Sequence, residues 1–70
     1  MVAQVSNKVF LYRTKSGSTQ EDVAQSTGVS RQTIIAIEKG NYTPSVLLAI
    51  KIAQHFNVSV EDIFTITHNR

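Results

Sequence analysis

The side chains best suited to specific binding chemistry stand together at one helix-like start, which reads Ser30, Arg31, Gln32, Thr33. An arginine can donate two parallel hydrogen bonds to guanine, and a glutamine can pair in the same way with adenine. Hydroxyl groups and the free backbone N–H groups of a helix start suit phosphate oxygens. Ala36, about one turn further on, offers a methyl group that can touch a thymine methyl. The segment therefore has the chemistry of a base-reading helix, provided that its neighbours turn this end outward.

Enzymatic and metal chemistry find little support in the sequence. The chain has no cysteine, so disulfide bonds and thiolate ligands are excluded. His55 and His68 stand apart, whereas a metal site needs several ligands that converge on one point. The acidic pairs at 21–22 and 61–62 each open a predicted helix, where negative charge is favourable without any catalytic role. We therefore expect no enzyme activity, no catalytic residue, no metal and no cofactor.

Helix stops and helix starts divide the chain into segments. Glycine and asparagine tolerate the left-handed conformation that ends many helices. The four predicted stops are Gly17, Gly28, Gly40 and Asn57. Side-chain oxygens that can cap the next helix follow three of these stops. The three predicted caps are Thr19, Ser30 and Ser59. The dipeptide Thr43-Pro44 predicts the remaining start, with Pro44 at the first helical position.

The resulting prediction is an all-α domain of five helices. Their expected ranges are about 6–15, 20–27, 31–39, 45–56 and 60–65. Numerous β-branched residues near the C-terminus leave a short strand open as an alternative there. We expect the first three residues and residues 68–70 to be loose. Residues 1–70 are predicted to form one domain, with its core at about 7–64 and a tail at 65–70.

Apolar side chains recur at helical spacing, which predicts one buried face for each helix. The predicted core consists of Val9, Tyr12, Val23, Ala24, Val29, Ile34, Ile37, Val46, Ala49, Ile52, Ala53, Phe56, Val58, Ile63 and Phe64. Further apolar side chains exceed what so small a domain can bury. They are Phe10, Leu11, Leu47, Leu48, Ile50 and Ile66. This excess predicts a homodimer whose interface uses the last helix, the tail and part of the fourth helix.

The segment at about 20–39 predicts two short helices joined by a tight turn, which is a helix-turn-helix. Ala24 is small enough for the two helices to cross closely, and Gly28 can adopt the sharp turn. Val29 is expected to fill the angle between the helices, while the isoleucines of the second helix hold it against the core. This assignment turns the polar start of the second helix outward.

Two longer stretches carry a resemblance to a known family. TQEDVAQSTGVSRQTIIAIEKG and NYTPSVLLAIKIAQHFNVSVEDIF resemble the DNA-binding domain of the phage Cro/CI repressor type. The resemblance covers roughly residues 7–64, and it extends to short single-domain regulators with the pattern SRQTI…IE.G.Y.PS…A.KIA..F.VS.E.IF. It implies the five-helix lambda-repressor-like fold, with the helix at 31–39 in the major groove of DNA.

The resemblance also implies DNA contacts at particular positions. The base-reading positions are Arg31, Gln32 and Ala36. The positions that the resemblance implies for the DNA backbone are Gln20, Thr33, Lys39, Asn41 and Tyr42. Ser30 is expected to join them, because its hydroxyl group suits phosphate. Arg13 matches a first-helix arginine that supports the backbone contact or forms an internal ion pair. Glu38 is the expected partner in such a pair.

These observations predict a sequence-specific regulator of transcription, most simply a repressor, that binds double-stranded DNA as a homodimer. The net charge of +2 leans basic but is weak evidence by itself. No apolar run approaches the ~20 residues of a membrane span, and the N-terminus lacks the features of a signal peptide. We therefore expect no membrane partner and a cytoplasmic location.

A second function class remains open at this stage. The surplus of surface apolar residues also fits a protein-interaction module on the same fold, of an antitoxin-like or coactivator-type kind. In that case a protein partner would cover Phe10, Leu11 and the fourth helix, and Arg31 would stay free. The sequence does not predict the operator, the regulated genes or any effector.

Overall fold

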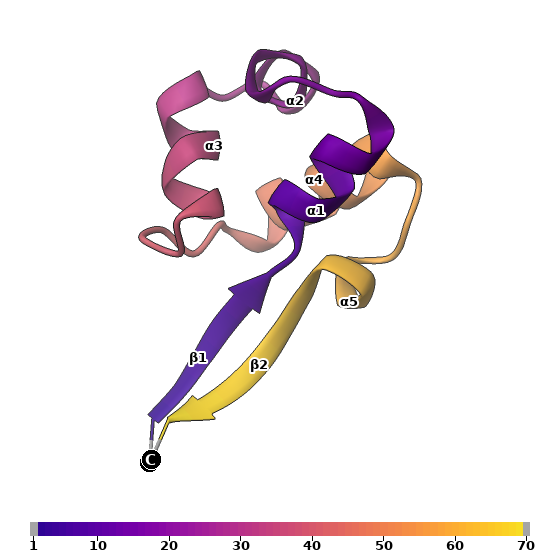
Figure 1. The fold of residues 1–70 in the computed structure, drawn as a ribbon. Helices are drawn as coiled ribbons and strands as arrows, with labels where there is room; N and C mark the ends of the chain where they lie inside the picture. The colour runs from indigo at the N-terminus through magenta and orange to yellow at the C-terminus, as the bar shows by residue number, and fades with distance from the viewer. Residues whose placement is uncertain (1, 70) are drawn as a thin grey trace.

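A computed structural model describes residues 2–69, which form five helices and two strands (Figure 1). The elements are β1 (Val2–Asn7), α1 (Val9–Ser16), α2 (Gln20–Thr27), α3 (Arg31–Glu38), α4 (Val46–Phe56), α5 (Val60–Ile63) and β2 (Phe64–Asn69). The helices pack around one core, and the two strands project from it as an arm (Figure 1). The arm makes the molecule elongated, with extents of 36 × 22 × 21 Å.

The ends of the helices follow the predicted stop and cap residues. Gly17, Gly28 and Asn57 adopt the left-handed conformation just after α1, α2 and α4, and Gly40 also has a positive φ. The hydroxyl groups of the three predicted caps accept hydrogen bonds from backbone N–H groups of the following helix. These side chains satisfy donors that would otherwise lack a partner at a helix start.

The start of α4 differs from the prediction. The cap is Ser45, whose Oγ accepts a hydrogen bond from the backbone N–H of Leu48, and the helix begins at Val46. Pro44 therefore lies outside the helix and not at its first position. The serine hydroxyl gives the first turn a hydrogen-bond partner that a proline cannot supply.

The two strands correct the purely all-α prediction. β1 and β2 pair antiparallel, with Val5 opposite Ile66 and Asn7 opposite Phe64. The first helix therefore starts at Val9 and not near residue 6, and the last helix ends at Ile63. The alternative of a C-terminal strand is confirmed. Residues 2, 3, 68 and 69 were expected to be loose but lie in paired strands, while residues 1 and 70 lie outside the described part.

The core is largely the predicted one. Among the described residues, the large side chains with no measurable exposure are Val9, Val23, Ile34, Ile37, Ile52 and Ile63. The remaining partly buried members, Tyr12, Val29, Phe56, Val58 and Phe64, pack against this cluster. Val46 was predicted to be buried but is 77% exposed, and Leu48, predicted to be in surplus, is only 7% exposed. Within residues 2–69, none of the helices is long and apolar enough to cross a membrane.

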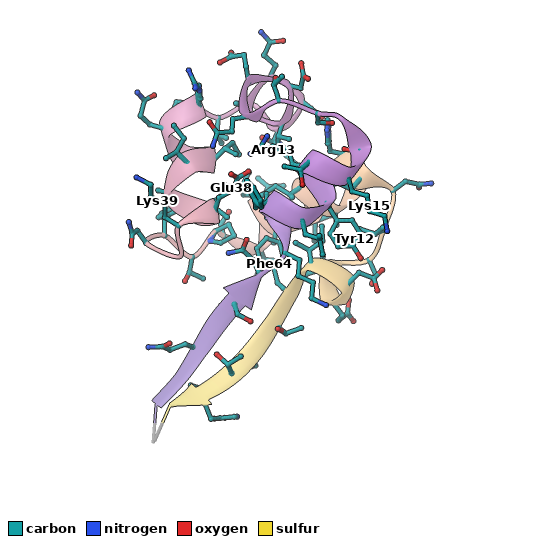
Figure 2. All side chains as sticks on the ribbon, in the orientation of Figure 1. Tyr12, Arg13, Lys15, Glu38, Lys39 and Phe64 are labelled. Carbon is teal, nitrogen blue, oxygen red and sulfur yellow. The ribbon has the colours of Figure 1, made fainter. Side chains whose placement is uncertain are left out.

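A small set of hydrogen bonds joins the arm to the helices. The side-chain amide of Asn7 donates to the carbonyl of Ile37 at 2.9 Å, and its oxygen accepts from the N–H of Val9 at 3.1 Å. The N–H of Lys8 donates to the carbonyl of Ile63 at 2.9 Å. The base of the arm is thus fixed to the start of α1 and to the last turns of α3 and α5. Phe64 lies at this junction (Figure 2).

Candidate nucleic-acid interface

The geometry of the site begins with the turn between α2 and α3. Gly28 has a φ of 77°, and its N–H and that of Val29 both donate to the carbonyl of Ala24, at 2.9 and 3.1 Å. Ala24 is only 1% exposed where the two helices meet. Ser30 then caps α3 through the N–H of Thr33 at 3.3 Å. The turn is therefore built from local hydrogen bonds, and it fixes α3 at an angle to α2.

Burial of one face of α3 determines which side chains point outward. Ile34 and Ile37 have no exposed surface, so the opposite side of the helix faces solvent. Arg31 and Gln32 are both exposed at its first turn, and Lys39 is exposed just after its last residue. Figure 2 shows Lys39 on the side of α3 that faces away from the other helices. The start of the helix therefore presents polar and positively charged groups to solvent, as predicted.

Two shallow hollows flank this exposed face. The first is lined by Gln20 and Arg31 together with residues of the α1–α2 connection. The second brings together five side chains from α3 and the loop after it, namely Gln32, Thr33, Ala36, Asn41 and Tyr42. Seven of the nine predicted contact residues thus line one hollow or the other. Ser30 and Lys39 lie at the two ends of α3, outside both hollows.

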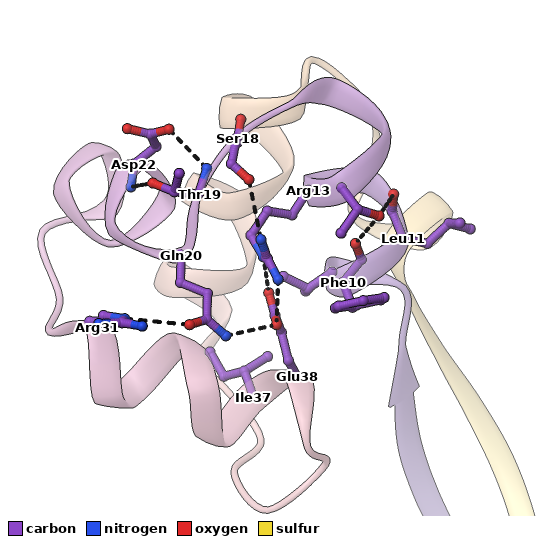
Figure 3. A network of polar contacts seen from close by, with 12 residues as sticks. Phe10, Leu11, Arg13, Ser18, Thr19, Gln20, Asp22, Arg31, Ile37 and Glu38 are labelled. Carbon is purple, nitrogen blue, oxygen red and sulfur yellow. Dashed lines mark hydrogen bonds and ion pairs between the residues drawn. The ribbon is translucent and has the colours of Figure 1, made fainter.

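A chain of polar contacts runs from the exposed face into the protein (Figure 3). Arg31 Nε donates to Gln20 Oε1 at 3.4 Å, and Gln20 Nε2 donates to Glu38 Oε1 at 3.1 Å. Because a carboxylate only accepts hydrogen bonds, Glu38 requires Gln20 to present its NH₂ group inward. The carbonyl oxygen of Gln20 is then left facing Arg31. The two side chains expected to meet DNA first are therefore oriented by a glutamate behind them.

Arg13 anchors the inner end of this chain. Its Nε and Nη2 donate to the two oxygens of Glu38 at 2.5 and 3.2 Å, which is a bidentate ion pair. Its Nη1 donates to the carbonyl of Ser18 at 3.2 Å, and the Phe10 ring lies 5.3 Å from the guanidinium carbon. The two charged side chains are only 13% and 7% exposed. This confirms the internal pair between Arg13 and Glu38 and fixes α1 to the end of α3.

The start of α2 is held by a reciprocal pair of hydrogen bonds. The N–H of Thr19 donates to Asp22 Oδ2 at 2.8 Å, and the N–H of Asp22 donates to the Thr19 hydroxyl at 3.0 Å. The hydrogen bond from the Thr19 backbone, and then that from its side chain, lower the pKa of Asp22 below its ordinary value. Gln20 is the first residue of this helix, so the capping box also positions its side chain.

Sequence reasoning did not find the links of Gln20 to Arg31 and Glu38. Gln20 lies 11 residues before Arg31 and 18 residues before Glu38 in the sequence, and no local pattern relates residues at such distances. It also treated Phe10 only as surplus apolar surface, whereas its ring supports Arg13. The resemblance to the Cro/CI type did identify Glu38 as the partner of Arg13, but it gave no sign that Glu38 also holds Gln20. In the described part of the chain, no three potential metal ligands come together.

The turn at Gly28 and the burial of one face of α3 show that the protein is a helix-turn-helix domain whose second helix turns its polar start outward. The chain matches the family model described as helix-turn-helix over residues 10–63. It therefore belongs to the helix-turn-helix family of the Cro/CI type, whose members are DNA-binding transcriptional regulators.

Individual proteins support this assignment. An HTH-type transcriptional regulator of Methanocaldococcus jannaschii is 60% identical over 60 residues, covering 86% of this chain and 91% of that protein. The HTH-type transcriptional regulator YgzD of Bacillus subtilis is 48% identical over 60 residues, with the same two shares covered. The crystal structure of the transcriptional regulator VanUg superposes with a TM-score of 0.79 and 21% identity, covering 99% of this chain and 92% of VanUg. At that identity, the likeness to VanUg concerns the fold alone.

Proposed function

We propose that two copies of this chain bind one duplex DNA site, each with α3 in the major groove. Arg31 and Gln32 then read base edges, and Ala36 lies against a thymine methyl group or a neighbouring base. The observation that carries the proposal is the exposed, capped start of α3, where Arg31 and Gln32 point to solvent and Ile34 and Ile37 hold the opposite face in the core.

Six side chains around α3 are assigned to the DNA backbone. They are Gln20, Ser30, Thr33, Lys39, Asn41 and Tyr42. The hollow between α3 and the following loop is lined by amide, hydroxyl and aromatic groups, which can hydrogen-bond to or pack against a sugar-phosphate strand. Ser30 keeps its cap on α3 while its hydroxyl still has hydrogen-bonding capacity for a phosphate. Contacts of this kind fix the register of the protein on the duplex, so that Arg31 meets a defined base.

The simplest biological consequence is repression. A regulator of this size that covers a promoter excludes RNA polymerase by its presence, and it needs no catalytic step. The same binding next to a promoter can also recruit polymerase through an exposed surface, which makes activation the other outcome. We place this activity in the cytoplasm, where the chain's DNA target would be found.

The proposal is tested by selecting bound sites from random duplex DNA and then measuring affinity for the selected site. Arg31→Ala should weaken binding by about 1–3 kcal/mol and relax the preference at one base position of each half-site. Lys39→Ala should weaken binding to all sequences similarly. Lys15→Ala is the matched control, because Lys15 lies on α1, away from α3 (Figure 2). Unchanged affinity and preference in Arg31→Ala would refute the assignment of α3 as the recognition helix.

A protein-interaction function is the alternative, and one observation favours it. Phe10 and Leu11 are adjacent on α1 and are 58% and 54% exposed. A different protein that docked there would leave α3 free. If no duplex shifts at low salt while another protein is captured through α1, and Leu11→Glu abolishes the capture, the alternative replaces the DNA-binding proposal.

A further inference from the structure

We infer that Glu38 and Gln20 are positioning residues, which hold the Arg31 side chain from behind and thereby favour guanine as the base that it contacts. The inference rests on the proposed function, because it needs α3 in the major groove with Arg31 at a base. It deepens that proposal by giving the Gln20 side chain a partner in Arg31. The contact of Gln20 with a phosphate then falls to its backbone N–H, which has no acceptor within α2 because Gln20 is the first residue of the helix.

The orientation of the Gln20 amide is determined from both of its sides (Figure 3). Its Nε2 donates to Glu38 Oε1 at 3.1 Å, and its Oε1 accepts from Arg31 Nε at 3.4 Å. A flipped amide would place its oxygen against the carboxylate and its NH₂ group against the guanidinium. Both contacts would then be repulsive, because a carboxylate only accepts hydrogen bonds and a guanidinium only donates them. The atom that Gln20 turns toward Arg31 is therefore an acceptor.

Glu38 is held firmly enough to impose this orientation. Its two oxygens accept hydrogen bonds from Arg13 in a bidentate pair, which fixes the plane of the carboxyl group. The Glu38 side chain is only 7% exposed, so water has little access to replace Gln20 as a donor to the carboxylate. The position of the Gln20 oxygen in front of Arg31 therefore depends on an ion pair between α1 and α3, behind the exposed face.

The contact with Gln20 uses one particular group of the Arg31 guanidinium. Because the Nε–H is directed at Gln20 Oε1, both terminal nitrogens stay available to other acceptors. They form a planar fork that matches two acceptors lying side by side. In the major groove, guanine presents two such acceptors, O6 and N7, whereas adenine places a donor beside its N7 and thymine has the single acceptor O4. The free end of Arg31 therefore matches guanine.

Holding Arg31 before DNA arrives also affects how strongly it binds. Arg31 is exposed, and an unrestrained arginine samples many rotamers that are lost when it pairs with a base. Preordering one such side chain is worth about 2- to 10-fold in affinity. The gain applies only to sites with guanine at the contacted position, since Arg31 makes no bidentate pair at other sites. Gln20 and Glu38 therefore contribute to sequence preference without touching a base.

The same geometry argues against a phosphate contact by the Gln20 side chain. Its donor group faces Glu38, and its oxygen cannot bond to a phosphate oxygen because both atoms only accept hydrogen bonds. A phosphate contact would strengthen binding to every sequence alike. A positioning role strengthens binding only where guanine meets Arg31, so the two roles predict different results for a variant that lacks the amide.

The test uses Gln20→Met, which keeps the length of the side chain and removes both of its hydrogen-bonding groups. Sites selected by the wild type identify the base position at which Arg31→Ala loses its preference, and the base there should be guanine. At this position, Gln20→Met should reduce the preference for guanine over the other bases about 2- to 10-fold, and it should leave the affinity for non-specific duplex unchanged. Gln25→Met, at an exposed glutamine later on α2, is the matched control and should keep the wild-type preference.

Combining variants shows whether Gln20 acts through Arg31. In the Arg31→Ala background, Gln20→Met should cause no further loss of affinity for the selected site, because no guanidinium is left to orient. A merely structural role of Gln20 would lower the affinity by the same factor in both backgrounds. That result, an unchanged preference in Gln20→Met, an equal loss for all sequences or a base other than guanine would each overturn the inference.

A second measurement needs no DNA. Side-chain NMR relaxation of the Arg31 Nε–H group should show a more ordered guanidinium in the wild type than in Gln20→Met, and Gln25→Met should match the wild type. An Arg31 side chain that is equally mobile in the wild type and in Gln20→Met would contradict the inference. Circular dichroism checks that both variants keep their helices.

Failure of this inference and failure of the proposed function have different signatures. If the chain does not bind DNA through α3, the wild type selects no duplex, or Arg31→Ala leaves affinity and preference unchanged. If the chain is a regulator in which Gln20 has no positioning role, the wild type binds its site and Arg31→Ala relaxes one base position. Gln20→Met then keeps the wild-type preference at that position.

Discussion

At the scale of single residues, Glu38 accepts hydrogen bonds from two side chains, Arg13 and Gln20, and through Gln20 it orients Arg31. Removing only the glutamate leaves the Arg13 guanidinium nearly buried without a counter-charge. We expect Glu38→Ala to lower the free energy of unfolding by about 3 kcal/mol, at the low end for broken buried pairs because Arg13 keeps slight exposure. Urea unfolding followed by circular dichroism measures this.

A double variant serves as the control, because it removes both charges and keeps the site filled with side chains. In the double variant Arg13→Met with Glu38→Met, no charge is left unpaired, and two flexible apolar side chains occupy the site. Its free energy of unfolding should return to within about 1 kcal/mol of the wild type. DNA affinity should not return, since Gln20 and Arg31 have lost the acceptor that orients them. A double variant as unstable as Glu38→Ala would show that the ion pair itself, and not an unpaired charge, is what matters.

Asp22 makes the stability of the fold depend on pH. Its pKa is lowered in the folded state because the Thr19 backbone and then the Thr19 side chain hydrogen-bond to it. A lowered folded-state pKa means that the stabilisation is complete above the unfolded-state pKa of about 4. It is lost as the pH falls from there through the folded-state pKa. Asp22→Asn should therefore unfold at a lower temperature than the wild type at pH 7, and the difference should narrow below pH 4.

Thermal unfolding scans between pH 2.5 and 7 measure this narrowing. Glu21→Gln is the matched control, because it removes the same charge from the same first turn without touching the capping box. It should change the unfolding temperature at pH 7 by less than Asp22→Asn does. A gap between wild type and Asp22→Asn that stays constant down to pH 2.5 would contradict the role given to the carboxylate.

At the scale of elements, the turn between α2 and α3 depends on one backbone conformation. Gly28 has a φ of 77°, and a Cβ built there would meet no atom within 4 Å. The cost of a side chain is therefore backbone strain and not a clash. Gly28→Ala should lower the free energy of unfolding by about 1–2 kcal/mol, the usual penalty for the left-handed conformation. Gly28→Asn should lower it by less, because asparagine tolerates this conformation, as Asn57 does at the end of α4.

Chemical denaturation of the two Gly28 variants gives the comparison. Equal losses for alanine and asparagine would mean that the lack of a side chain, and not the left-handed conformation, is what the turn requires. DNA affinity of the folded variants should change little, because the strain is confined to the turn and α3 keeps its packing on Ile34 and Ile37.

The sequence predicts an element well when the contacts that form it join residues close together in the chain. Caps and stops act within three or four residues, so Thr19, Gly28 and Ser59 were readable in the sequence and the helices they bound were predicted nearly correctly. The β-branched residues indicated β2 as an alternative, but its partner β1 comes from the opposite end of the chain, and no local pattern relates the two strands. On α4, helical spacing assigned Val46 to the core in place of Leu48, because nearly every residue in the first turns of this helix is apolar and the pattern does not single out one face.

The same distinction between local and long-range contacts applies to the site. The outward direction of Arg31 and Gln32 follows from burial of Ile34 and Ile37 at helical spacing, so sequence alone predicts it. The orientation of Gln20 depends on Glu38, which reaches it from the far end of another helix. Contacts of that kind become visible only when the helices are placed relative to one another. The assignment of individual residues to bases or phosphates remains a prediction for the binding experiments.

At the scale of the whole molecule, the salt dependence of DNA affinity reports how many copies of the chain bind one site. A protein that neutralises Z phosphates loses affinity with a slope of log K against log salt concentration near −0.9Z. A dimer on a full site should neutralise twice as many phosphates as a single copy on a half-site. We therefore expect the slope on the full selected site to be about twice the slope on a duplex that carries one half-site, measured by fluorescence anisotropy between 50 and 200 mM salt.

The two duplexes have the same length and differ only in the sequence of the second half-site, so that the number of available phosphates is the same in both. The ratio of slopes depends on how many copies bind the DNA, because each copy neutralises its own set of phosphates. Equal slopes on the two duplexes would mean that one copy binds in either case. The proposal that paired α3 helices read a palindrome would then be wrong.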